Sequence, residues 1–99
     1  MSQVRVVVVL QADPGKGAEQ VAAFDAVAPL VRAEDGCLQY DLHAVADDPD
    51  RFVVLEHWAS REALDAHLDA PHMATYADQV GAFRQQPAEI HVISAERIA

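Results

Sequence analysis

The chain has 99 residues, 52% of them hydrophobic, which predicts one globular domain spanning residues 1–99. Sixteen acidic against seven basic residues give a formal net charge of −9, which argues against nucleic acid and anionic membrane surfaces as partners. The single cysteine excludes an internal disulfide and a multi-cysteine zinc site. The apolar run near the N-terminus is too short for a signal peptide or a membrane-spanning helix, so we expect a cytoplasmic protein.

The N-terminal half of the chain predicts a strand, a helix and a second strand. Residues 4–10 are rich in valine on both alternating faces, which is typical of a central strand that is covered on both sides. Residues 18–32 repeat apolar side chains at helical spacing. The predicted buried stripe of this helix is Val21, Phe24, Val27, Ala28, Leu30 and Val31. Residues 37–44 predict the next strand, with Leu38, Tyr40 and Leu42 on one face.

The C-terminal half predicts a hairpin followed by two helices and a strand. A turn at residues 47–50 leads into a third strand at residues 51–58, so the second and third strands form an antiparallel hairpin. Ser60 is a good N-cap for a short helix whose inner face carries Leu64, His67 and Leu68. Pro71 ends this helix and opens another, which we expect to end near residues 85–87. Residues 89–95 predict the last strand.

The order β-α-β-β-α-β, with the second helical segment broken at Pro71, predicts a ferredoxin-like α+β fold with a four-stranded antiparallel sheet. In such a fold the helices cover one face of the sheet. The other face has nothing in this chain to cover it, although the first and third strands are apolar on both sides. We therefore expect the bare face to pack against a second copy in a two-fold homodimer.

Several short motifs occur in the order and spacing of a known family. They are GCLQY at 36–40, DP at 48–49, FVVLEHW at 52–58, EALDAHL at 62–68 and PH at 71–72. Through them the chain resembles the antibiotic biosynthesis monooxygenase superfamily over about residues 4–93. The resemblance implies a dimeric α+β barrel with a pocket between sheet and helices in each subunit. Several members oxygenate quinols or phenols without metal or flavin, whereas others degrade haem or isomerise a phosphorylated sugar.

The resemblance and the strand pattern together indicate which residues form this pocket. Either His67 or His72 is expected to be the catalytic base, because an imidazole can remove a phenolic proton near neutral pH. A carboxylate that faces an apolar pocket would have a raised pKa and could also accept a proton. The expected substrate-binding residues are Phe52, Glu56, Trp58 and Tyr76. Each of these side chains also has a plainer interpretation as part of the core or, for Glu56, as a solvated strand end.

We expect no metal and no cofactor. His67 and His72 are five residues apart across a proline, which is not the i, i+4 spacing of helical metal ligands. The haem-degrading members of the family carry an asparagine in the first strand, and residues 4–10 contain none. The chain also lacks the glycine patterns of nucleotide-binding loops.

The leading hypothesis from the sequence is a cofactor-independent monooxygenase that oxidises a small quinol or phenolic aromatic with dioxygen. Two alternatives stay open. One is an isomerase that uses the same pocket base, which would need an arginine or lysine in the pocket for a phosphate. The other is a non-catalytic dimer that binds a small molecule or serves in a stress response.

Overall fold

The computed structural model describes residues 2–99 and contains one four-stranded antiparallel sheet with three helices. The strands are β1 (Val4–Gln11), β2 (Cys37–Val45), β3 (Asp48–Trp58) and β4 (Glu89–Ser94), in the order β2-β3-β1-β4. Helix α1 (Gly17–Arg32) joins β1 to β2, and α2 (Arg61–Leu68) and α3 (Pro71–Gly81) join β3 to β4. This arrangement confirms the predicted ferredoxin-like α+β fold. None of the helices in residues 2–99 is long and apolar enough to cross a membrane.

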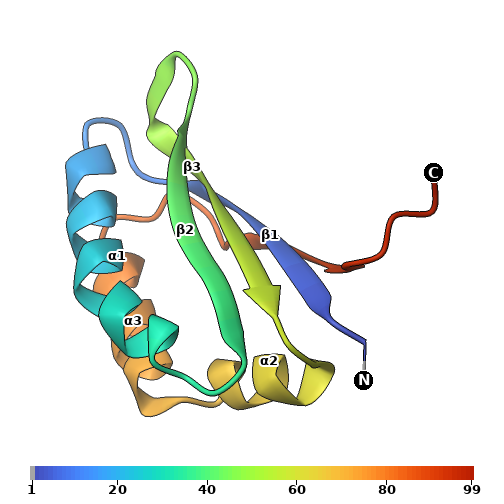
Figure 1. Cartoon of the computed structure of the whole chain (residues 1–99). Helices are drawn as coiled ribbons and strands as arrows, with labels where there is room; N and C mark the ends of the chain where they lie inside the picture. Colours follow the sequence, from blue (N-terminus) through green and yellow to red (C-terminus); the bar gives the residue numbers. More distant parts are fainter. Residues whose placement is uncertain (1) are drawn as a thin grey trace.

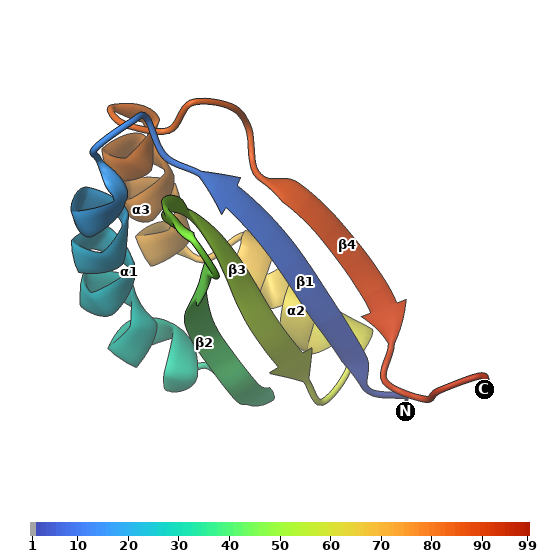
Figure 2. The same ribbon diagram turned by 90° about the horizontal axis from the view of Figure 1, so that it is seen from above.

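The helices form a layer on one face of the sheet, with α1 and α3 side by side (Figure 1). Val6, Val8 and Leu10 of β1 point toward this layer and are buried, whereas Val7 and Val9 alternate to the other face and are only partly covered. β4 lies at the edge of the sheet beside β1, far from α1 (Figure 2). All six residues of β4 are exposed, so its inner face is free to form one wall of an opening.

Local sequence signals set the start of the two short helices. The Ser60 hydroxyl accepts a hydrogen bond from the backbone N–H of Ala63, as predicted for an N-cap, and Pro71 occupies the first turn of α3. Gly36 has a φ of 82°, and a Cβ there would lie 2.6 Å from the Ala63 side chain. Only glycine fits this position, and it lets the loop after α1 pack closely against α2.

The hairpin differs from its predicted form in two places. β3 begins at Asp48, so the turn consists of Ala46 and Asp47, and Asp47 adopts a positive φ of 67°. The register shifts between Cys37 and Gln39, which inserts Leu38 as an extra residue in β2. Leu38 is therefore 53% exposed, and it does not share the buried face of Tyr40 as predicted.

Two helix predictions are also corrected. Val21 and Leu30 of the predicted α1 stripe are exposed, while Gln20, a polar residue, is buried because it has hydrogen-bonding partners inside the core. Helix α3 ends at Gly81, before the predicted residues 85–87. The chain beyond it bonds to the end of β1 instead, since Asp13 donates to the Phe83 carbonyl and Gln85 donates to the Gln11 carbonyl.

Candidate active site

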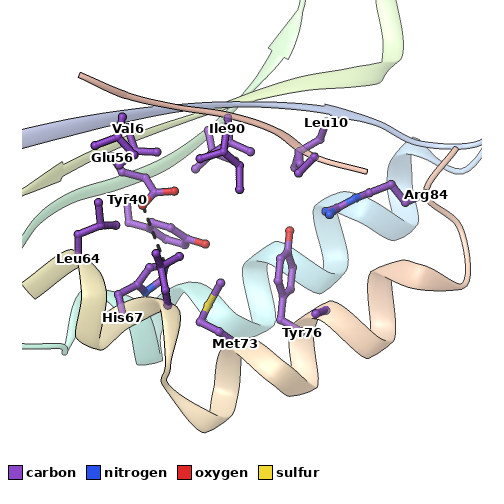
Figure 3. A pocket seen from close by; sticks show the side chains of 16 residues that line it. Val6, Leu10, Tyr40, Glu56, Leu64, His67, Met73, Tyr76, Arg84 and Ile90 are labelled. Carbon is purple, nitrogen blue, oxygen red and sulfur yellow. Dashed lines mark ion pairs between the residues drawn. The ribbon is translucent and has the colours of Figure 1, made fainter. Parts of the chain in front are cut away.

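A cavity of about 170 Å³ lies between the sheet and the helices, under β1 and β4 (Figure 3). Most of its wall is aliphatic, and the polar side chains lie mainly at its two ends. Figure 3 shows Leu64, His67 and Glu56 at one end and Tyr76 and Arg84 at the other. The 16 lining residues are Val6, Val8, Leu10, Tyr40, Val54, Glu56, Leu64, His67, Leu68, Met73, Tyr76, Ala77, Arg84, Ala88, Ile90 and Val92.

His67 is the central polar side chain of the first end. α2 holds it on the inner face beside Leu64, and only 2% of its surface is exposed. Its ring packs against the rings of Trp58 and Tyr40, with centroids 4.6 and 5.6 Å away. Its Nε2 lies 4.0 Å from Oε1 of Glu56. The imidazole is thus locked between aromatic rings, with Nε2 on the side of the cavity carboxyl.

Glu34 holds the other nitrogen of this imidazole. Its Oε2 is 3.0 Å from Nδ1 of His67 and 2.7 Å from Nε2 of His72, so one carboxylate bridges both histidines. A carboxylate only accepts hydrogen bonds, so Nδ1 of His67 donates to Glu34, and in the neutral imidazole Nε2 is the nitrogen without a proton. Glu34 lies in the loop that Gly36 seats against α2.

Glu56 has a partner of its own on β3. The indole Nε1–H of Trp58 donates to Oε1 of Glu56 over 2.9 Å, and both residues are buried. Burial raises the pKa of the Glu56 carboxyl, while the Trp58 hydrogen bond and nearby His67 lower it in part. The carboxyl is therefore less acidic than a surface glutamate and better able to take up a proton.

The second end of the cavity is a hydrogen-bonded chain of three residues from three segments. Arg84 donates through a terminal guanidinium nitrogen to Oε1 of Gln20 over 3.1 Å. The Gln20 amide in turn donates to the Tyr76 hydroxyl over 2.8 Å. Burial raises the pKa of Tyr76, with Gln20 and Arg84 lowering it in part, so its hydroxyl stays protonated near neutral pH.

Comparison with known proteins shows the family of the chain. Residues 3–79 match the family model described as antibiotic biosynthesis monooxygenase. The chain belongs to this family. Its predicted resemblance is therefore confirmed, and family membership supports a monooxygenase-type function.

Relatives of this antibiotic biosynthesis monooxygenase domain agree in sequence and in structure. The chain is 41% identical to a Mycobacterium tuberculosis protein named "Putative monooxygenase Rv0793", over 74% of this chain and 71% of that protein. It is 31% identical to the Escherichia coli "Probable quinol monooxygenase YgiN", over 76% of this chain and 82% of that protein. The solved structure of Rv0793 superposes with a TM-score of 0.88 over 99% of both chains, at 36% identity.

The structure brings three of the six predicted site residues of this monooxygenase domain to the cavity wall: Glu56, His67 and Tyr76. Trp58 and Phe52 lie on the same strand face, but they are covered by the helix layer and sit outside the lining. His72 also lies outside it, because the first turn of α3 directs it to Glu34 and to a shallower hollow between α1 and α3.

The prediction from sequence missed Glu34, Gln20 and Arg84. Glu34 precedes the predicted strand as an ordinary loop acid, and Gln20 follows the charged Glu19 in the first turns of the helix. Their roles depend on partners 33 to 64 residues away along the chain, which no local pattern reveals. Within residues 2–99, no group of three or more histidine, cysteine or acidic side chains is arranged to hold a metal ion.

Proposed function

We propose that this protein is a cofactor-independent monooxygenase that oxidises a small quinol or phenolic aromatic with dioxygen. The observation that carries the proposal is His67: a buried imidazole whose Nδ1 is held by Glu34 and whose Nε2 faces a largely apolar cavity. A buried imidazole that a carboxylate orients in this way is suited to general-base catalysis. The monooxygenase names of the relatives agree with it.

The first step is removal of a phenolic proton by Nε2 of His67. Glu34 stabilises the imidazolium that forms, in the way a buried carboxylate supports a catalytic histidine. The resulting anion is electron-rich enough to reduce dioxygen, so the substrate itself supplies the electrons. The overall reaction balances as one quinol and one dioxygen giving one hydroxylated quinone and one water.

The remaining predicted residues have supporting roles in this proposal. Tyr76 contacts an oxygen of the substrate from the far end of the cavity, and Glu56 receives a proton beside His67. Trp58 and Phe52 lie behind the cavity wall, and Trp58 holds the Glu56 carboxyl by a hydrogen bond. His72 shares Glu34 with His67 and is partly exposed, so it connects the buried base to solvent.

The size of the cavity limits the substrate. An apolar protein cavity of about 150 Å³ holds benzene. A cavity of about 170 Å³ therefore accepts one aromatic ring with small substituents, and a second ring would extend through the opening beside Leu68, Ile90 and Val92. A single-ring or two-ring quinol fits this description.

Oxygen uptake tests the proposal. Purified protein free of metal and flavin should consume dioxygen with menadiol faster than the buffer alone, and His67→Gln should lose this activity. Glu62→Gln is the control, because Glu62 is an exposed residue of the same helix, α2, and lies outside the cavity. Wild-type uptake no faster than menadiol autoxidation across a panel of quinols would refute the proposed activity.

We also propose that the protein works as a homodimer through the uncovered sheet face. Apolar side chains lie in register there, with Val7 opposite Leu55 and Val9 opposite Val53. Sedimentation should give twice the mass of the chain, and Leu55→Arg should shift it to the monomer. Leu30→Arg, which changes an exposed leucine on α1, is the control. A wild-type protein that sediments as a single chain contradicts the dimer.

The isomerase alternative requires a cation beside the base for a substrate phosphate. Arg84 is the one arginine or lysine among the 16 lining residues, and it lies at the end of the cavity opposite His67. No observation at the site favours isomerisation over oxygenation.

A further inference from the structure

The second polar end of the cavity contains hydrogen-bond donors that no group of the protein accepts. Among residues 2–99, the Nε–H of Arg84 is the one buried side-chain nitrogen or oxygen without a hydrogen-bond partner. Leaving a buried donor unpaired, above all on a charged group, is costly, so such groups are usually paired in a working protein. Arg84 is one of the residues that line the cavity.

The hydroxyl of Tyr76 supplies a second donor at the same place. Arginine has donors only, so the amide oxygen of Gln20 must face Arg84 and its NH₂ group must face Tyr76. The Tyr76 oxygen therefore accepts from Gln20, and its own hydrogen is left to donate. Figure 3 shows the Tyr76 hydroxyl and the Arg84 guanidinium converging at one end of the cavity.

The charge at this end is also uncompensated. Arg84 forms no ion pair with any carboxylate of residues 2–99. Its guanidinium bonds instead to the neutral amide of Gln20, a residue that is only 1% exposed. Two convergent donors and one unpaired positive charge are complementary to an oxygen acceptor that carries full or partial negative charge.

We infer that Arg84 and Tyr76 form an oxygen-acceptor subsite, so that the preferred ligand is an aromatic ring with a hydroxyl at the His67 end and a carbonyl, quinol or carboxylate oxygen at the opposite, para position. This inference rests on the proposed function for the position of the reactive hydroxyl. It narrows the substrate class from phenols in general to para-quinols and para-acyl phenols. Gln20 is a positioning residue that orients both donors.

A thermodynamic cycle with two probes of equal size tests the subsite. The probes are 4-hydroxyacetophenone, which carries a para carbonyl, and 4-isopropylphenol, which has a methyl group in place of that oxygen. Binding of each is measured by calorimetry under nitrogen, without turnover. The affinity ratio of the two probes should fall by about tenfold or more from wild type to Arg84→Met, because a hydrogen bond to a charged donor is lost.

Three further measurements sharpen this test. Arg61→Gln removes an exposed arginine paired with Asp65 outside the cavity, and it should leave the ratio unchanged. Arg84→Lys keeps the charge and guards against misfolding of the methionine variant, and it should give an intermediate ratio. The probe 4-hydroxybenzoate distinguishes a carboxylate from a neutral carbonyl as the favoured acceptor.

The outcomes separate this inference from the proposed activity. An equal probe ratio in wild type and in the Arg84 variants, or no binding of any probe at millimolar concentration, overturns the subsite even if quinols are oxidised. A ratio that depends on Arg84 in a protein that shows no oxygen uptake keeps the subsite and refutes the monooxygenase reaction.

Discussion

The two ends of the cavity use opposite hydrogen-bonding chemistry. The end at α2 presents acceptors, the Nε2 of His67 and the carboxyl of Glu56, and it is backed by Glu34. The end at α3 presents donors, Tyr76 and Arg84. A cavity with the same chemistry at both ends would bind a ring in either direction. The difference between the ends orients a bound ring in this cavity, so that it loses its proton at the His67 end and its second oxygen is held at the Arg84 end.

Burial has the same effect on pKa at both ends but different chemical consequences. It raises the pKa of Glu56, which brings a carboxyl closer to taking up a proton near neutral pH. It also raises the pKa of Tyr76, which keeps a phenol in its donating form. One physical cause therefore strengthens an acceptor end and preserves a donor end.

The largest expected effect comes from removing the base at the acceptor end. His67→Gln should lower kcat/KM for quinol oxidation by about 10²–10⁴, the usual contribution of a general base. Affinity for 4-hydroxyacetophenone should change much less, since the Arg84 end is intact. Stopped-flow oxygen consumption and calorimetry measure the two quantities. Activity close to wild type in the variant would assign the base to another residue.

Glu34→Gln should break the orientation of the base while keeping its bulk. We expect a loss in kcat/KM of about tenfold to a hundredfold, as for other outer partners of functional histidines. The ¹⁵N NMR signals of His67 should show a single Nδ1-protonated tautomer in the wild type and a mixture in the variant. Glu62→Gln, at an exposed position of α2, is the control. Unchanged tautomer signals in Glu34→Gln would exclude the orienting role.

Trp58→Phe tests the hydrogen bond between Trp58 and Glu56, which both lie on β3. The variant loses the 2.9 Å hydrogen bond from the indole to a buried carboxyl. The free energy of unfolding should fall by about 2 kcal/mol, within the range for hydrogen bonds to charged groups. Urea denaturation at neutral pH measures the change. A variant as stable as the wild type would show that this hydrogen bond contributes nothing to folding.

The smallest effect is the pH dependence that Glu56 confers on stability. Its pKa in the folded state is raised above the usual value of 4.5, so the folded protein holds this proton more tightly than the unfolded chain does. The stabilisation is complete below pH 4.5 and is lost as the pH rises through the folded-state pKa. Wild-type stability should therefore decline relative to Glu56→Gln over this range. Parallel stability curves for the two proteins would contradict it.

Local patterns were sufficient to predict the elements of the fold. The valine-rich β1, the Ser60 cap and Pro71 at the start of α3 all act within a few residues, so their effect can be predicted without knowing the tertiary structure. The same is true of His67, whose position between two leucines predicts an inward direction. Prediction failed where distant segments decide the outcome, as at the inserted Leu38, which depends on pairing with β3.

The sequence by itself determined the order of elements, the helix caps and the inward face that carries Glu56 and His67. Only the tertiary structure decided which side chains form the two ends of the cavity. Glu34 meets His67 across 33 residues, and Arg84 meets Gln20 across 64, because the loop after α1 packs on α2 and the chain after α3 bonds to β1. Hydrogen bonds between distant segments leave no periodic trace in a sequence, since each partner is an ordinary polar residue until the fold brings the two together.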